Sequence, residues 1–187
     1  LKADIFNDVV QSILLLIGSG LLAALAIWHP AVGGLSGLLE KQPEKFHVFF
    51  EASHPELPWT GVLSGLMVLH LYYWGTNQFI VQRTLGARSD WDARMGTITA
   101  GFFKLLIPFL CIVPGMAAGY ILSIDPATES DTAFAGLTRT LLPAGYGLVG
   151  LVMAGLVAGI LSTIDSMMNA TATLFTFDVY RKYIRPE

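Results

Sequence analysis

Long apolar runs separated by short polar segments dominate the pattern along this chain. Four of these runs are long enough to cross a bilayer, which takes about 20 residues of helix. They predict membrane spans at about 9–28, 57–82, 95–124 and 142–177. Among Asp, Glu, Lys and Arg, only Lys104 interrupts the third span and only Asp165 interrupts the fourth. The pattern therefore predicts an all-α membrane protein with four transmembrane helices.

The composition supports a membrane protein and excludes several other classes. Apolar residues make up 53% of the 187 residues and charged residues 13%, whereas a soluble domain carries about 25% charged residues. A soluble protein with four buried core helices would have too little polar surface to cover them. Cys111 has no second cysteine to pair with, which excludes a disulfide scaffold. The net charge of −3 includes no basic block, so nucleic acid is not an expected partner.

Positive charges predict how the spans are oriented, because Lys and Arg favour cytoplasmic loops. They gather between the second and third spans and in the C-terminal tail, at Arg83, Arg88, Arg94, Arg181, Lys182 and Arg185. The segments on the opposite side of the membrane are mainly acidic. We therefore expect both termini to be cytoplasmic. The protein would be a multi-pass protein of the plasma membrane, or of the bacterial inner membrane if its source is prokaryotic.

The chain is interpreted as a piece of a longer membrane protein. It begins at Leu1 without a signal-peptide pattern and ends in a charged tail. The segment 29–58, between the first two spans, contains Gly33-Gly34 and prolines, so we expect it to be irregular or to hold a short helix.

Capping, proline and glycine residues predict local geometry. Ser89 and Asp92 fit a capping box, so a helix would begin after Ser89; the alternative is an ordinary polar turn. Pro108 and Pro114 predict kinks in the third span. In the fourth span, small residues would permit close helix approach at Gly147, Gly150, Gly155 and Gly159.

One face of the fourth span carries a cluster of oxygen-bearing side chains. Positions three and four apart share a helix face, which here groups Ser162, Asp165, Ser166 and Asn169. An ionisable residue inside a span usually faces a cavity or a partner, because lipid burial is costly. A carboxylate with hydroxyls suits a small hard cation such as sodium. The alternative is a polar seam between packed helices.

The second span contains residues that suit a polyhydroxylated ligand. Aromatic rings stack on the apolar faces of such a ligand while amides bind its hydroxyls, and the segment offers His70, Tyr73, Trp74, Asn77 and Gln78. Gly75 would ease a helix break, which is typical of transporter sites. The alternative is a set of core aromatics with a hydrogen-bonded histidine.

Lys104 is a candidate donor to a polar substrate or partner for a buried carboxylate. Its alternative role is a lysine that reaches the cytoplasmic membrane edge. An enzyme is not expected, because the four histidines lack metal-ligand spacing and no serine lies in a nucleophile elbow.

These segments together resemble the sodium/solute symporter family, and most closely its sodium–glucose cotransporter branch. The segment 72–85, YYWGTNQFIVQRTL, looks like the strongest signature of that branch. Similar segments lie at 1–11, 103–109, 114–116, 162–169 and 173–180. The resemblance implies an inverted repeat of five plus five helices with sites at the repeat interface. This fragment, 1–187, would supply core helices five to eight of one transporter domain, and the missing core helices of the same chain would be its partners.

The resemblance also implies which residues bind sodium. Ser162 and Thr163 match the side-chain ligands of the family's common sodium site, and Gly159 matches a backbone carbonyl ligand. Asp8 matches the acidic residue on the cytoplasmic sodium path. A second sodium site found in some members is matched by Asp8, Ser162, Asp165 and Ser166. We therefore expect two sodium ions per transport cycle.

For the solute, Tyr73 matches the inner aromatic gate, Trp74 its neighbour and Lys104 the sugar-bonding lysine. His70 departs from the Asn of bacterial galactose-transporting relatives, which leaves other hexoses and polyols such as inositol open. The function implied is sodium-coupled secondary active symport of a sugar or polyol by alternating access in a lipid bilayer. The alternatives are a transporter-like solute sensor and a symporter for a non-sugar organic solute.

Overall fold

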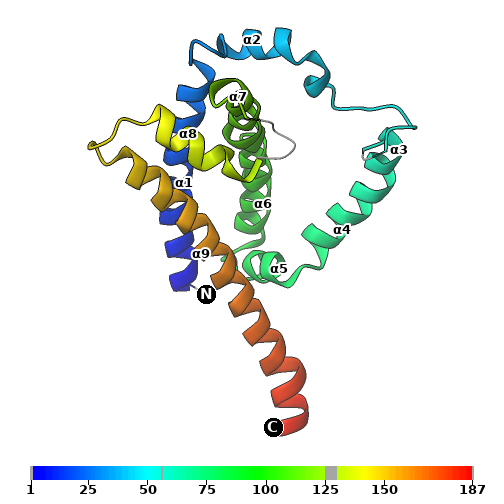
Figure 1. The fold of residues 1–187 in the computed structure, drawn as a ribbon. Helices are drawn as coiled ribbons and strands as arrows, with labels where there is room; N and C mark the ends of the chain where they lie inside the picture. The colour runs from blue at the N-terminus through cyan, green and yellow to red at the C-terminus, as the bar shows by residue number, and fades with distance from the viewer. Residues whose placement is uncertain (1, 56, 125–129, 187) are drawn as a thin grey trace. The chain divides into compact units, whose positions relative to one another are not determined.

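The computed structural model describes residues 2–55, 57–124 and 130–186, and these residues are organised as helices joined by turns (Figure 1). The α-helices are α1 Lys2–Ile27, α2 Gly34–Lys41, α3 Trp59–Gly61, α4 Met67–Gly75, α5 Gln78–Leu85, α6 Asp90–Lys104, α7 Val113–Ile121, α8 Ala133–Leu141 and α9 Leu148–Leu174. Short 3-10 helices occupy Pro43–Phe46 and Ser130–Thr132, and π-helical segments occupy Val62–Leu66, Pro108–Ile112 and Phe175–Ile184. The predicted all-α class is confirmed.

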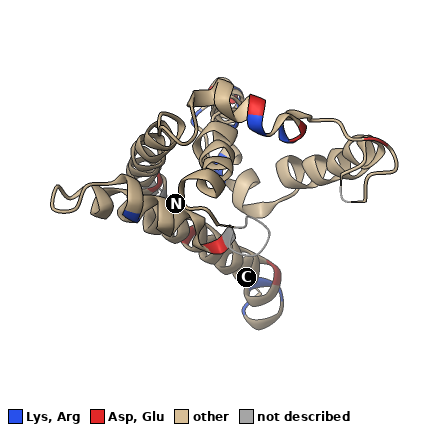
Figure 2. Ribbon diagram, turned by 45° about the horizontal axis from the view of Figure 1, so that its top comes forward, with Lys and Arg blue, Asp and Glu red and all other residues tan. Residues whose placement is uncertain are grey.

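Three helical stretches in the described part of the chain are long and apolar enough to cross a membrane. They are Ile5–Ile27, Asp90–Ile121 and Leu148–Ile184. They correspond to the predicted first, third and fourth spans. Large apolar side chains remain exposed on them, including Phe6 at 77% and Met168 at 66%. Most of the ribbon in Figure 2 is accordingly uncharged, as expected for helices that contact lipid.

The predicted second span forms a helix that breaks. Helical backbone runs from Trp59 through α3, Val62–Leu66 and α4 to Gly75. Asn77 then adopts an extended conformation, with φ −70° and ψ 115°, before α5 begins. The amides of Thr76 and Asn77 both donate to the carbonyl of Tyr72, at 3.0 and 3.1 Å. The helix break expected near Gly75 is therefore confirmed, whereas a membrane crossing by this segment stays a prediction.

Proline interrupts the third span as expected. Helix α6 ends at Lys104, four residues before Pro108, which begins the π-helical segment Pro108–Ile112. Proline cannot donate to the residue four positions earlier, and its ring clashes with that carbonyl. Ser89 caps the beginning of α6, because its hydroxyl oxygen accepts from the amide of Asp92 at 3.2 Å. The same hydroxyl donates to the Asp92 carboxylate at 2.8 Å.

The fourth span begins later than its apolar sequence suggests. Helix α9 starts at Leu148 rather than near 142. Pro143 disfavours helix, and Gly145 and Gly147 have φ of 91° and 73°, which favours glycine. The preceding helix α8 was not predicted. Its buried Thr138 donates its hydroxyl proton to the carbonyl of Phe134 at 2.8 Å.

The chain divides into two compact units. Unit 1 comprises Leu1–Pro43 and Gly101–Asp165, and unit 2 comprises Glu44–Ala100 and Ser166–Glu187. In unit 1, α1 packs against α7 and α8 (Figure 1). Its core contains Leu22, Ala118, Leu137, Leu142 and Val152. In unit 2, α4 contacts the segment Val62–Leu66 and α5.

Helices α1 and α9 approach closely and run antiparallel in unit 1. A Cβ built on Gly18 would lie 3.2 Å from Val152 Cα, and one built on Gly155 would lie 2.9 Å from the Leu14 carbonyl oxygen. The close approach predicted at Gly155 is therefore confirmed. Gly150, by contrast, has no atom within 4 Å of an added Cβ.

The segment 29–58 contains the short helix α2, as the sequence allowed. Lys41 at the end of α2 donates to the carbonyl oxygens of Ala31 and Val32, at 2.6 and 3.3 Å. These bonds fold the segment back onto the turn that follows α1, so α2 has a defined position in unit 1.

Candidate functional site

A polar contact between α1 and α9 joins Asp8 to Ser162. The Ser162 hydroxyl donates a hydrogen bond to the Asp8 carboxylate. Asp8 is only 9% exposed, so its carboxylate is largely removed from water and depends on polar partners. Both residues were predicted from the sequence as sodium ligands or sodium-path residues, and the fold brings them into contact.

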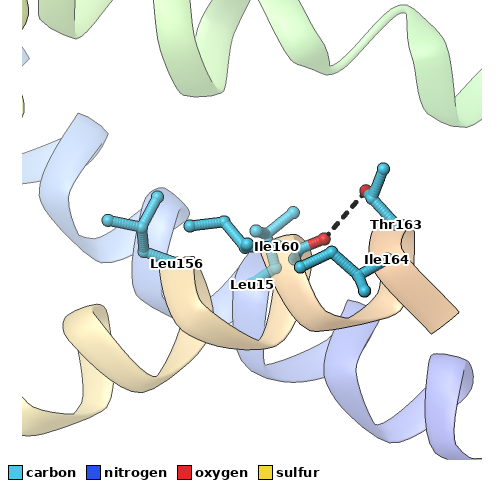
Figure 3. A pocket seen from close by; sticks show the side chains of 6 residues that line it. Leu15, Leu156, Ile160, Thr163 and Ile164 are labelled. Carbon is cyan, nitrogen blue, oxygen red and sulfur yellow. Dashed lines mark hydrogen bonds between the residues drawn. The ribbon is translucent and has the colours of Figure 1, made fainter.

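Gly159 and Thr163 form the next polar pair on α9. The Thr163 hydroxyl donates to the Gly159 carbonyl oxygen at 3.0 Å (Figure 3). Because Gly159 lies inside α9, its carbonyl oxygen also accepts the helical amide of Thr163, so both of its lone pairs are used, whereas the donating Thr163 hydroxyl can still accept. Of the two predicted sodium ligands, the Thr163 hydroxyl can therefore face a cation in this arrangement, whereas the Gly159 carbonyl would first have to release a donor.

A cavity of about 360 Å³ adjoins this pair. Its walls are otherwise apolar, and it is lined by Leu15, Leu156, Gly159, Ile160, Thr163 and Ile164 (Figure 3). A Cβ on Gly159 would lie 2.9 Å from a Leu15 methyl carbon, so only glycine fits against Leu15 without a shift. The glycine thus leaves its own backbone accessible beside the cavity.

Ser166, which lies one turn beyond Ser162 on α9, has a different partner. In unit 2 the guanidinium of Arg83 on α5 donates a hydrogen bond to the Ser166 hydroxyl. Ser166 is 7% exposed. Asp165 is half-buried. A buried hydroxyl that was predicted to face sodium therefore accepts a hydrogen bond from a cationic side chain of the same unit.

The oxygen atoms near the contact of α1 with α9 differ from the ligands of a transition-metal site. Among the described residues, no three His, Cys, Asp or Glu side chains gather as a metal-binding group. The donors found instead are one carboxylate, hydroxyls and a backbone carbonyl. Hard cations prefer such oxygen donors.

All of the predicted solute residues except Lys104 lie near the helix break in unit 2. The rings of Tyr73 and Trp74 meet edge to face with centroids 5.6 Å apart. Tyr73 also meets Phe79 of α5 edge to face at 6.0 Å. The break therefore holds a small aromatic cluster, and Phe79 is a member that the sequence reasoning did not single out.

His70, Asn77 and Gln78 are arranged differently around this cluster. His70 is exposed, and its Nδ1 lies 2.5 Å from the carbonyl oxygen of Leu66 on the same helix. Since a carbonyl oxygen only accepts, Nδ1 is the donor in this bond and Nε2 points elsewhere. Asn77 is the N-cap residue of α5 but makes no side-chain cap bond, and Gln78 is the first residue of that helix.

A cavity of about 240 Å³ lies beside the break. It is lined by Trp74, Gly75, Val81, Thr84, Leu85 and Thr97. Among the predicted solute residues, Trp74 is on its wall. Lys104 belongs to unit 1 and is exposed at the end of α6, so its place in a common solute site stays a prediction.

Two residues of these sites were missed by sequence reasoning. Arg83 was considered only for membrane orientation, although it lies one turn beyond Phe79 on the helix after the break. Gln11, whose buried Oε1 atom lies on the same helix as Asp8, was considered only as the end of the similar segment 1–11. Its spacing of three residues from Asp8 was a usable signal, because that spacing places both on one helix face.

Comparison with known proteins extends this picture. The sodium:solute symporter family matches the chain over residues 1–187. The sodium/glucose cotransporter of Vibrio parahaemolyticus is 37% identical over 100% of this chain and 38% of its own length. The sodium/myo-inositol cotransporter 2 of Sus scrofa is 33% identical over 100% of this chain and 32% of its own length.

The sodium/glucose cotransporter 1 of Sus scrofa is 31% identical over 97% of this chain and 33% of its own length. The chain thus spans roughly a third of the length of these relatives. No solved structure matches it. The family match covers every residue of the sequence, from the helix that carries Asp8 to the end of the helix that carries Ser162, and the chain therefore belongs to the sodium:solute symporter family.

Proposed function

We propose that this chain is part of a transporter that couples the entry of sodium to the uptake of a sugar or polyol. The observation that carries the proposal is the Asp8–Ser162 contact between α1 and α9. A buried carboxylate beside hydroxyl and carbonyl oxygens can replace the hydration shell of a small cation. The relatives named as sodium/glucose and sodium/myo-inositol cotransporters support the same pairing of cation and solute.

The chain would form part of an inverted repeat of five plus five helices. It would supply core helices five to eight, with the second predicted span among them, and other helices of the same protein would complete the sites. The large exposed apolar area on α1, α6 and α9 supports such partners as well as lipid. Both termini would face the cytoplasm of a cell whose plasma membrane holds the protein.

Coupling would follow from differential binding. Sodium at Gly159, Ser162 and Thr163 would stabilise the outward-open state and so favour solute binding there by a coupling free energy. Asp8, Asp165 and Ser166 would hold a second sodium ion or guide its exit. Each sodium ion that crosses adds about 2.3 kcal/mol of driving force per 100 mV of membrane potential.

The solute would bind near the broken helix. Trp74 and Tyr73 offer aromatic faces, and the polar groups of His70, Asn77, Gln78 and Lys104 suit the hydroxyls of a sugar or polyol. The break leaves backbone groups near Thr76 and Asn77 that a continuous helix would consume. Tyr73 would yield as an inner gate when the two repeats rock.

The test is uptake by the intact transporter in proteoliposomes. Labelled glucose, galactose, myo-inositol and an amino acid would be compared with and without an inward sodium gradient. Sodium-driven accumulation of a sugar or of myo-inositol is expected. Accumulation of the amino acid alone would overturn the solute class, and tight binding of a sugar without accumulation would indicate a sensor and overturn symport.

A further inference from the structure

One stripe of α1 faces α9 in unit 1. It consists of residues spaced three and four apart, Asp8, Gln11, Leu15, Gly18 and Leu22, the spacing of a helix face that packs against another helix. Contacts along it are direct. Asp8 accepts from Ser162, Leu15 meets Gly159, and Gly18 meets Val152. Gln11 therefore lies between the level of Asp8–Ser162 and the level of Leu15–Gly159.

Gln11 carries an unusual oxygen. Its Oε1 atom is buried and has no hydrogen-bond partner among the described residues. Buried polar atoms are nearly always paired, and one that is not calls for an explanation such as an ion. An amide oxygen has two lone pairs and no charge. The Gln11 amide oxygen could therefore bind a sodium ion without placing a second carboxylate near that of Asp8.

We propose that Gln11 is a sodium ligand of this chain, whose Oε1 binds the ion as it moves between the level of Gly159 and the level of Asp8. The proposal rests on the sodium-coupled function proposed above and adds a residue to it. Asp8 supplies the negative charge, and Gln11 supplies a neutral oxygen one helical turn deeper. The Ser162 hydroxyl lies opposite on α9.

A second glutamine provides a matched control. Gln42 also has a buried Oε1 without a partner among the described residues. Its Nε2, however, donates to the Tyr120 hydroxyl at 3.0 Å, at the end of unit 1 that holds α2. It therefore shares the unpaired oxygen of Gln11 but is remote in sequence and contacts from the Asp8–Ser162 pair.

The experiment measures sodium-dependent thermal stabilisation of the intact transporter in detergent, with potassium replacing sodium to keep the ionic strength constant. Three variants are compared with wild type: Gln11→Met, Gln11→Glu and Gln42→Met. Met keeps the unbranched shape of Gln but is a poor sodium ligand. A ligand that binds only the folded state stabilises it by RT ln(1 + L/Kd), where L is the free ligand concentration, so the rise of Tm with sodium concentration reports the Kd for sodium.

Gln11→Met is expected to raise Tm by a few degrees in sodium-free buffer, because it removes an unpaired buried oxygen. It is expected to raise the sodium Kd obtained from the dependence of Tm on sodium about tenfold. Gln42→Met should keep the wild-type sodium response, and Gln11→Glu, which keeps an oxygen ligand and adds a negative charge, should bind sodium at least as tightly as the wild type. These opposite effects on stability and on sodium response separate a ligand from a merely structural residue.

Two results would overturn the proposal. An unchanged sodium response in Gln11→Met would exclude Gln11 while leaving sodium coupling intact. If Gln11→Met does not fold, Gln11→Glu decides, and a tenfold weaker sodium response in that variant also excludes a ligand role. Absence of any sodium stabilisation in the wild type would instead overturn the proposed function itself.

Discussion

Ser162 on α9 donates a hydrogen bond to the carboxylate of Asp8 on α1, although 154 positions separate the two residues in the sequence. The contact is buried, since Asp8 is 9% exposed. Close contacts of glycines with leucine and valine residues lie on the same interface. A polar pair at this place contributes less to packing than an apolar one would, which favours a role in binding a cation.

The first prediction concerns the charge of Asp8. Asn at this position can still accept the Ser162 hydrogen bond, so Asp8→Asn should fold but lose its attraction for sodium. We expect the sodium concentration for half-maximal uptake to rise at least tenfold, about 1.4 kcal/mol. The measurement is sodium activation of solute uptake, with the exposed Asp90→Asn as control. Equal effects of the two variants would argue against a sodium role for Asp8.

The second prediction concerns the number of sodium ions. Asp165 lies on the polar face of α9 with Ser162 and Ser166. If it helps to hold a second ion, Asp165→Asn should lower the ratio of charge to solute from about two toward one, since a lost ion removes one charge per cycle. Current and solute flux in proteoliposomes give this ratio. An unchanged ratio with unchanged sodium activation would remove Asp165 from the sodium site.

The third prediction concerns Arg83 and Ser166. Each single variant, Arg83→Gln and Ser166→Ala, should lower the free energy of unfolding by about 1–3 kcal/mol, because each breaks a charge-assisted hydrogen bond of a buried hydroxyl. The double variant should cost less than the sum, with a coupling of at least 0.5 kcal/mol. Denaturation of the intact protein in detergent measures all three. Exposed Arg88→Gln serves as control, and strict additivity would mean that the contact adds no stability.

The fourth prediction compares two glycines of α9. Gly155→Ala places a Cβ 2.9 Å from the Leu14 carbonyl oxygen and should destabilise the fold by about 1–3 kcal/mol. Gly150→Ala meets no atom within 4 Å and should be neutral or stabilise by up to about 1 kcal/mol. Thermal unfolding of both variants tests this difference. A similar loss in both would contradict the close approach of α1 to α9.

The sequence predicted the local backbone structure correctly where residues close together in the chain determine it. Ser89 caps α6 because its side chain reaches an amide three residues ahead. The helix break after Gly75 and the end of α6 before Pro108 follow from backbone rules that act within one turn. The start of α9 at Leu148 differs from the prediction, because the apolar run begins before Pro143. Gly145 and Gly147 then adopt positive φ, which keeps this part of the apolar run out of the helix.

By itself, the sequence determined the helical class, three apolar spans and the family, because hydropathy and ordered motifs are properties of consecutive residues. Only the tertiary structure decided that Asp8 meets Ser162, that Arg83 meets Ser166, and that Gln11 turns an unpaired oxygen toward the interior. Periodicity places a side chain on a face of its own helix. Which face of another helix lies opposite depends on packing, and here glycines such as Gly155 set how closely α1 and α9 approach.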